Sequence, residues 1–485
     1  MAGSAVMPIA ASYNKSMRGL LLVVLLVLAT TDVLQAQNPS SIEFPLGEII
    51  AKVEVREDPS QSYALYLPPS YTRGRRWPIL YLFDARGRAL VPVEVFRDAA
   101  ERYGYILASS YNTASDDSVE PDMEAVRTLW RDTHERFAID ARRVYMAGFS
   151  GEARLACLMA DAVRGAVAGV IACGAGFSPA SPPRRGMEFI LFGAVGNTDF
   201  NHDEMIRLDA TLDALDAVHR IEVFDGGHGW PPAQICTEAV EWMELHAMKD
   251  GARPKDPSLI ETLYGARLTK AREAERAKAV YDAYHRYLTL SQDLVGLKDV
   301  QEAEDKVSSL KASKELSDVL EARQERLDRD ADYLKRASES FARQSPDDPM
   351  ALGKALQQLQ IKSLKKKAAN ESDLEESLSA QRRLESVFVQ TSFYVPRRLF
   401  EQQDYERAIL SLSIATKIKP ASPYVWFTLA RAQARTGRKG SAVKSLERAV
   451  EAGLTDAALL LENTDLESLR DNKDFRQLIR ELEDK

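Results

Sequence analysis

One serine lies in a setting that indicates chemistry. Ser150 belongs to the string Gly148-Phe149-Ser150-Gly151-Glu152, which follows the apolar run 144–147 and precedes a stretch with helical periodicity. A serine between a strand and a helix can present its hydroxyl as a nucleophile, because small neighbours let the backbone turn sharply. The Gly151 amide, at the start of the expected helix, would face a developing oxyanion. The string predicts a nucleophile elbow with Ser150 as the nucleophile.

Glu152 departs from the usual pattern of this turn, which has a glycine two residues after the serine. A glutamate fits there only if its side chain points away from the neighbouring strand. A carboxylate is otherwise favourable in the first turn of a helix, because it meets the positive end of the helix dipole. The motif alone is short enough to occur by chance, so the interpretation depends on the partners of the serine.

An acid and a base follow the serine in the order that such a site requires. Asp199 lies in a turn after the apolar run 189–192, and His228 lies in a glycine-rich loop after the run 221–224. The histidine would take the serine proton and return it to the leaving group, while the acid would orient the imidazole. We therefore predict a Ser150, Asp199 and His228 triad, with Asp203 and Asp225 as alternative acids.

A second oxyanion donor is expected from the loop that follows the apolar run 78–83. This loop lacks the His-Gly-Gly string of many lipases and esterases. An amide of Ala85 or Arg86 is the predicted donor, together with that of Gly151. The side chains of Arg86 and Arg88 either meet an acidic group of a substrate or remain solvated.

These residues require a framework of strands and helices, and residues 42–248 provide the pattern for one. Eight runs favour strands: 51–55, 63–67, 78–83, 105–109, 144–147, 167–173, 189–192 and 221–224. Stretches with helical periodicity lie at 120–137, 152–162 and 203–217. Alternating strands and helices predict an α/β fold with a mostly parallel sheet, covered on both faces, and an antiparallel edge.

The composition changes after residue 248. Residues 249–257 contain two prolines and mixed charge, which is typical of a linker. Residues 258–388 are rich in Ala, Leu, Glu, Lys and Arg with apolar residues at helical spacing, so we expect long amphipathic helices.

The last part of the chain, 389–485, contains an internal repeat. Small and apolar residues recur 34 positions apart: Ala408, Leu412 and Ala415 correspond to Ala442, Leu446 and Ala449. This resembles the tetratricopeptide repeat, a helix–turn–helix unit whose small residues lie where the helices approach closely. The resemblance is good for 423–456 and fair for 389–422, where Pro396 replaces a small residue. It implies a surface for binding a protein partner.

The N-terminal residues 1–36 have the layout of a secretory signal peptide. Lys15 and Arg18 precede the apolar run 19–29, and Ala36 offers a small residue for cleavage before Gln37. The alternative is an uncleaved N-terminal anchor. No later segment is apolar enough for a second span. We expect an exported protein, periplasmic or extracellular, without a stable membrane span after cleavage.

Charge and cysteine content exclude several classes of function. The 485-residue chain has a formal net charge of −8 and a pI near 5.6, which argues against a general nucleic-acid-binding protein. Its cysteines are Cys157, Cys173 and Cys236, and none forms a C-x-x-C pair, so no zinc or redox motif is indicated. We expect these thiols to be small buried residues.

The first domain also resembles a family of bacterial exported esterases that is similar to feruloyl esterases and polyhydroxybutyrate depolymerases. The similarity lies in the strings at 63–71, 147–151 and 224–232 and covers roughly residues 45–248. It implies hydrolysis of a small-molecule or polymeric ester through an acyl-enzyme, without a metal or an organic cofactor. The alternatives are a binding protein on an inactive hydrolase fold and an interaction scaffold based on the repeats.

Overall fold

The computed structural model describes residues 44–115, 118–343 and 348–483. The expected signal peptide therefore lies outside the described residues. The chain divides into two compact units, Met1–Gln324 and Glu325–Lys485, and the division falls within helix α10 (Lys314–Arg343). Among the described residues, no helix is both long enough and apolar enough to cross a membrane.

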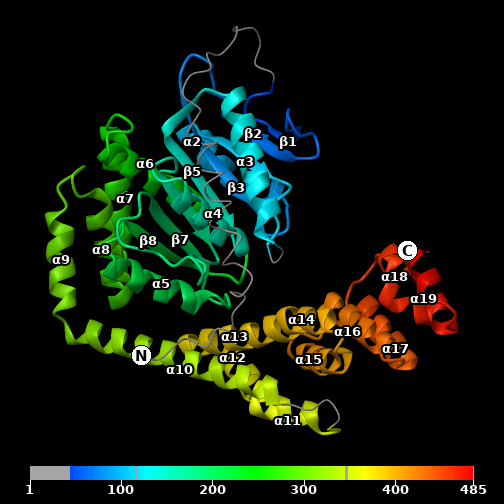
Figure 1. Cartoon of the computed structure of the whole chain (residues 1–485). Coiled ribbons are helices and arrows are strands. Elements are labelled where there is room, and N and C mark those ends of the chain that lie inside the picture. The colour runs from blue at the N-terminus through cyan, green and yellow to red at the C-terminus, as the bar shows by residue number, and fades with distance from the viewer. Residues whose placement is uncertain (1–43, 116–117, 344–347, 484–485) are drawn as a thin grey trace. The chain divides into compact units, whose positions relative to one another are not determined.

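An eight-stranded sheet forms the centre of the first unit (Figure 1). Its strand order is β1-β2-β4-β3-β5-β6-β7-β8, with β2 antiparallel to both neighbours and the remaining pairs parallel. The strands are β1 (Ile49–Glu54), β2 (Ser62–Tyr66), β3 (Trp77–Phe83), β4 (Ile106–Ser110), β5 (Ile139–Phe149), β6 (Gly169–Cys173), β7 (Ile190–Gly196) and β8 (His219–Phe224). The prediction of a mostly parallel sheet with an antiparallel edge is confirmed.

Helices cover both faces of the sheet. On one face lie α3 (Val119–Arg136), α4 (Gly151–Ala162) and α5 (His202–Ala214), and on the other α2 (Leu90–Tyr103) and α6 (Ala233–Lys249) (Figure 1). Strand β3 shows why helices must pack on both faces of the sheet. Ile79 and Tyr81 belong to the core beneath α3 and α4, whereas Leu80 and Leu82 belong to the core beneath α2 and α6. Side chains alternate across a strand, so a strand that is apolar throughout must be buried on both faces.

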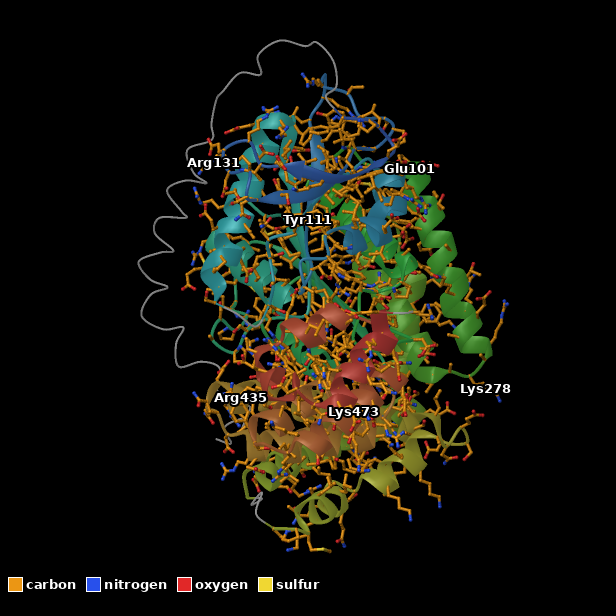
Figure 2. The ribbon with its side chains drawn as sticks, turned by 90° about the vertical axis from the view of Figure 1, so that its right-hand side faces the viewer. Glu101, Tyr111, Arg131, Lys278, Arg435 and Lys473 are labelled. Carbon is orange, nitrogen blue, oxygen red and sulfur yellow. The ribbon has the colours of Figure 1, made fainter. Side chains whose placement is uncertain are left out.

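A tyrosine side chain connects β4 with β1 at the antiparallel edge of the sheet. Tyr111 follows β4 directly, and its hydroxyl donates a hydrogen bond of 2.6 Å to the Ala51 carbonyl of β1 (Figure 2). The bond reaches across β2, which lies between β4 and β1 in the sheet.

Three helices beyond the predicted linker pack against the first domain. They are α7 (Pro257–Arg276), α8 (Val280–Leu294) and α9 (Gln301–Lys311), and Lys278 marks the turn between α7 and α8 (Figure 2). Leu245 and Met248 of α6 share one apolar core with these helices.

A buried carboxylate on α8 reinforces this packing. Asp293 accepts hydrogen bonds from Trp242 Nε1 at 2.8 Å, from Arg220 at 2.8 Å and from Arg267 at 2.5 Å. These donors lie on α6, β8 and α7, so one side chain joins three elements. The change in composition at 249–257 therefore does not coincide with the division into compact units.

The second unit is helical in its described residues. Beyond α10 its elements are α11 (Ala351–Gln358), α12 (Ile361–Ala368), α13 (Leu374–Val389), the π-helical turn η1 (Gln390–Tyr394), α14 (Val395–Glu401), α15 (Tyr405–Ile418), α16 (Pro423–Arg435), α17 (Lys439–Glu451), α18 (Ala457–Glu462), the 3₁₀ turn η2 (Thr464–Leu469) and α19 (Lys473–Glu483). The six residues that recur at a spacing of 34 are all fully buried. A helix-rich C-terminal region is confirmed, whereas its assignment to the tetratricopeptide family stays a prediction.

Candidate active site

Ser150 lies in a sharp turn between β5 and α4. Its φ of 59° and ψ of −121° are rarely adopted by a residue with a side chain, so the turn stores backbone strain. Two glycines make the turn possible. A Cβ on Gly148 would lie 2.1 Å from the Glu152 carbonyl oxygen, and one on Gly151 would lie 2.2 Å from the Ser115 Cβ. The backbone of Glu152 therefore excludes a side chain at Gly148, and the side chain of Ser115 excludes one at Gly151.

Glu152 is only 1 % exposed, although it occupies the position where a glycine was expected. It lies in the first turn of α4. The carboxyl group is thus buried beside the turn rather than solvated. The turn keeps its shape because two parts of the backbone approach each other at Gly148 and not at Glu152. Gly148 faces the backbone of residues 152 and 153.

Ser150, Asp199 and His228 lie together at the carboxyl ends of β5, β7 and β8. The Ser150 hydroxyl is 2.9 Å from His228 Nε2, and His228 Nδ1 is 2.9 Å from each carboxylate oxygen of Asp199. This chain of hydrogen bonds needs a proton on Nδ1, which leaves the Nε2 lone pair facing the serine. The order serine, base, acid is the one required to activate a hydroxyl.

Asp199 is fully buried and well held. The amide of Asn201 donates to it at 2.8 Å, and its own amide donates to the Gly196 carbonyl. The two alternative acids have other partners. Asp203 lies 2.9 Å from His202 Nδ1, and Asp225 accepts a hydrogen bond of 3.1 Å from Asn197.

The imidazole of His228 is confined between aromatic rings. The Phe149 and Phe200 rings lie 4.7 and 4.3 Å from it between centroids. Its side chain is 18 % exposed, so one edge remains open to solvent and to a substrate.

The loop after β4 connects the loop after β3 with the elbow. Gly151 packs against Ser115 of the loop after β4, and Ser115 donates its amide hydrogen to the carbonyl of Ala85, in the loop after β3, at 3.1 Å. Of the predicted oxyanion donors, Arg86 directs its amide to the Asp84 carboxylate at 2.9 Å. The amides of Ala85 and Gly151 are not in such a bond among the described residues. The prediction of Arg86 as an oxyanion donor is therefore wrong, because its amide hydrogen is bound to Asp84. The amides of Ala85 and Gly151 stay predicted donors.

Two residues of this region were missed from the sequence. Asp84 is fully buried at the end of β3, and Trp230 donates its Nε1 hydrogen to it at 2.8 Å. Burial raises the pKa of Asp84, but hydrogen bonds from Arg88, Trp230 and two amides outweigh it and lower the pKa below its usual value. The sequence signal that could have indicated a role for Asp84 is its place at the end of a wholly apolar strand.

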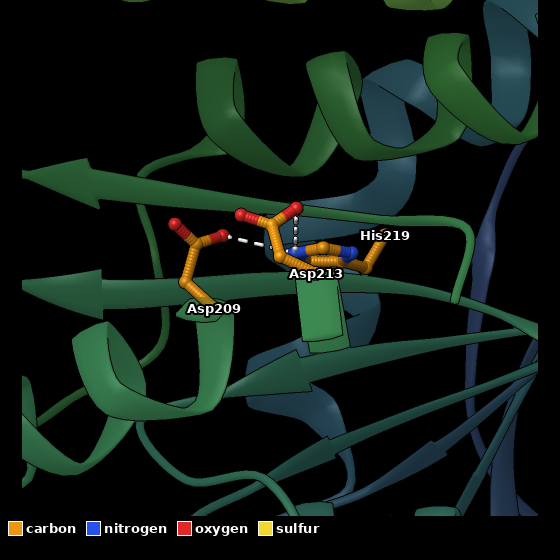
Figure 3. Close-up of side chains that lie close together, drawn as sticks. All are labelled: Asp209, Asp213 and His219. Atoms are coloured by element: carbon orange, nitrogen blue, oxygen red, sulfur yellow. Dashed lines mark hydrogen bonds and ion pairs between the residues drawn. The ribbon is translucent and has the colours of Figure 1, made fainter. Parts of the chain in front are cut away.

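A second cluster of ligand-type side chains lies at the opposite ends of the strands. His219 begins β8, and its Nε2 is 3.1 Å from an Asp209 oxygen and 3.9 Å from one of Asp213 (Figure 3). Its Nδ1 is 2.9 Å from the Ala217 carbonyl oxygen. Burial lowers the pKa of His219, but the bonds to Asp209 and Ala217 outweigh it and raise the pKa. A protonated imidazole accounts for these contacts.

The three cysteines are all buried, as predicted, and none of them forms a disulfide. Burial raises the pKa of the Cys157 thiol to about 12, so this thiol stays protonated at neutral pH.

The strand order, the helices on both faces and the serine turn after β5 define the first unit as an α/β-hydrolase fold. Several solved hydrolases are similar to it. A ferulic acid esterase shares 14% identity over 40% of this chain and 97% of its own, with a TM-score of 0.35. An S-formylglutathione hydrolase from Staphylococcus aureus shares 14% over 42% and 99%, with a TM-score of 0.34. An esterase from Pyrobaculum calidifontis shares 14% over 47% and 92%, also at 0.34.

No protein-family profile and no curated protein sequence matches the chain.

Proposed function

We propose that the protein is a serine hydrolase that cleaves carboxylic esters through an acyl-enzyme, with Ser150 as nucleophile, His228 as general base and acid, and Asp199 as the orienting acid. The observation that carries the proposal is the unbroken chain of hydrogen bonds from Ser150 Oγ through His228 to Asp199. The positive φ of Ser150 supports it, because strain of this kind occurs where a nucleophile must stand clear of the sheet.

The proposed reaction has two halves. In the first, His228 Nε2 takes the hydroxyl proton while Ser150 Oγ attacks the ester carbonyl. The amides of Gly151 and Ala85 stabilise the tetrahedral oxyanion, and its collapse releases the alcohol with the proton from His228. In the second, His228 takes a proton from a water molecule whose oxygen attacks the acyl carbon. Collapse of this intermediate breaks the bond to Ser150 Oγ, which regains the proton from His228, and the carboxylic acid leaves. Asp199 orients the imidazole and stabilises the imidazolium in both halves.

A fluorophosphonate probe tests the proposal directly, because it reacts with an activated serine and not with an ordinary hydroxyl. The full chain should be labelled at Ser150, as located by mass spectrometry of the peptides, and Ser150→Ala should not be labelled. A panel of p-nitrophenyl esters with increasing acyl length should then show turnover. An unlabelled wild type would favour the alternative, a binding protein on an inactive hydrolase fold.

We further propose that the enzyme is exported, because residues 1–36 carry the charge and hydropathy pattern of a signal peptide. Residues 1–36 fused to alkaline phosphatase should make the phosphatase active, because this enzyme is active only after export. Replacing part of the apolar run 19–29 with charged residues should abolish that activity. Residues 389–485 are proposed to bind a protein partner, because they contain the 34-residue repeat.

A further inference from the structure

Asp84 is a buried carboxylate with an unusually complete set of donors. Its Oδ1 accepts hydrogen bonds from the amides of Arg86 and Arg88 at 2.9 and 3.2 Å and from Arg88 Nε at 2.9 Å. Its Oδ2 accepts from Arg88 Nη2 and from Trp230 Nε1, at 2.9 and 2.8 Å. A group with such a set of bonds holds its partners rigidly, because each lost bond would leave a buried polar atom unsatisfied.

These donors come from the two loops on which the proposed chemistry depends. Arg86 and Arg88 belong to the loop after β3 that carries the Ala85 amide. Trp230 lies two residues after His228, 146 residues further along the chain than Asp84. Among the described residues, the Trp230 side chain has this single hydrogen bond, and its ring packs on Phe149, beside the serine, at 5.7 Å between centroids.

We propose that Asp84 is a positioning residue. It holds the loop after β3 and the loop that carries His228 in a fixed arrangement, so that the Ala85 amide and His228 act on the same carbonyl group. The inference rests on the proposed hydrolase function. If Asp84 had only a structural role, it would neutralise Arg88 and close the turn. Its loss would then have no effect specific to the transition state.

Two variants separate these roles. Asp84→Asn preserves size, but its amide can present an oxygen on only one side. With the oxygen toward the loop amides, its NH₂ group faces the donors of Arg88 and Trp230, and the link between the loops is lost. Trp230→Phe removes the donor of that link alone and keeps an aromatic ring against Phe149. It remains informative if Asp84→Asn does not fold.

The chain offers a matched control. Trp242 donates its Nε1 hydrogen to buried Asp293 at 2.8 Å, the same distance as in the Trp230 and Asp84 pair. Trp242→Phe therefore breaks an equivalent tryptophan–aspartate bond on α6, away from the triad. It reports what such a loss costs in stability alone.

The measurements are kcat and KM for p-nitrophenyl acetate and the rate of fluorophosphonate labelling, on the full chain. We expect Trp230→Phe to lower kcat about tenfold and Asp84→Asn about a hundredfold, each with KM nearly unchanged, since contacts needed only in the transition state are lost. Trp242→Phe should leave kcat unchanged. The double variant Asp84→Asn/Trp230→Phe should be no slower than Asp84→Asn, because both changes remove one shared contact.

Three results would overturn the inference. The first is wild-type kcat in Trp230→Phe or in folded Asp84→Asn. The second is a loss of kcat in Trp242→Phe as large as that in Trp230→Phe, because the effect would then be one of general stability. The third is additive losses in the double variant. A wild-type chain that neither labels nor turns over would instead overturn the proposed function, and this inference with it.

Discussion

Ser150, Asp199 and His228 each follow a different strand, and their alignment depends on the carboxyl ends of β5, β7 and β8 meeting at one edge of the sheet. Ser150 lies in a recognisable turn motif, whereas Asp199 and His228 are not unusual in their own segments of sequence. Their common property is position, since in parallel strands the loops after each strand gather at the same edge.

The first prediction concerns these residues. Ser150→Ala and His228→Ala should each abolish measurable ester turnover, and Asp199→Asn should lower kcat by about 10⁴, because an asparagine favours the wrong imidazole tautomer. Steady-state kinetics on a p-nitrophenyl ester provide the measurement. Asp225→Asn is the control, since Asp225 bonds to Asn197 rather than to His228. Full activity in Asp199→Asn would move the role of the acid to Asp203 or Asp225.

At the scale of elements, the junction of β5 and α4 is the tightest point of the site. Gly148→Ala would place a methyl group 2.1 Å from a backbone oxygen, which no side-chain movement can relieve. We expect a loss of at least about 2 kcal/mol in the free energy of unfolding, measured by urea denaturation, together with a loss of labelling at Ser150.

The control for this variant is Gly265→Ala. Gly265 lies within α7, and a Cβ there meets nothing within 4 Å. Alanine should therefore stabilise the helix by about 0.5–1 kcal/mol. Equal effects of the two changes would contradict the close packing at the elbow.

The elements themselves could be predicted well from the sequence. All eight strands overlap the apolar runs that indicated them. The buried parallel strands were the clearest, because a strand buried on both faces has little choice of composition. Helices α3, α4 and α5 also lie where helical periodicity placed them. The triad order and the two serine-flanking glycines followed from the same pattern.

Other features could not be predicted from the local sequence. Asp84 and Asp293 are buried carboxylates. The place of Asp84 at the end of an apolar strand was its only signal, and Asp293 resembles an ordinary surface residue of a helix. Their partners lie up to 146 residues away for Asp84 and 73 for Asp293, so only the tertiary structure brings the charges together. The sequence left open whether the helices after the linker bind a partner or pack on the first domain, since a composition typical of solvated helices also suits a helix with one buried stripe. The structure shows α7 and α8 packed on the first domain.

For the whole molecule, buried histidines make stability depend on pH. Burial, with a smaller contribution from Lys249, lowers the pKa of His246 to about 4, and burial also lowers the pKa of His134 and His285. In the unfolded chain these rings take up a proton near pH 6.5, whereas the folded protein resists it. Stability should therefore fall as the pH drops from about 6.5 toward 4, by on the order of 3 kcal/mol for His246 alone.

His246→Phe tests this dependence, because it keeps a ring against Trp242 and cannot be protonated. The free energy of unfolding, measured by denaturant titration at several pH values, should fall less steeply in this variant between pH 6.5 and 4. His219→Gln should change the pH dependence of stability in the opposite sense. The pKa of His219 is raised, so its stabilising contribution is complete below pH 6.5 and is lost at higher pH. An unchanged slope in His246→Phe would refute the assignment.

The bonds of Asp293 have a consequence for shortened forms of the chain. Arg220 lies on β8, an edge strand of the sheet, and Trp242 lies on α6; both direct a polar hydrogen to a carboxylate of α8. A chain that ends before α8 would leave the buried Trp242 N–H group without its acceptor, whereas Arg220 would keep Glu222 and Glu238 as partners. An unsatisfied N–H group costs about 1–3 kcal/mol, so a fragment meant to fold by itself should end after α8 and not at the change in composition.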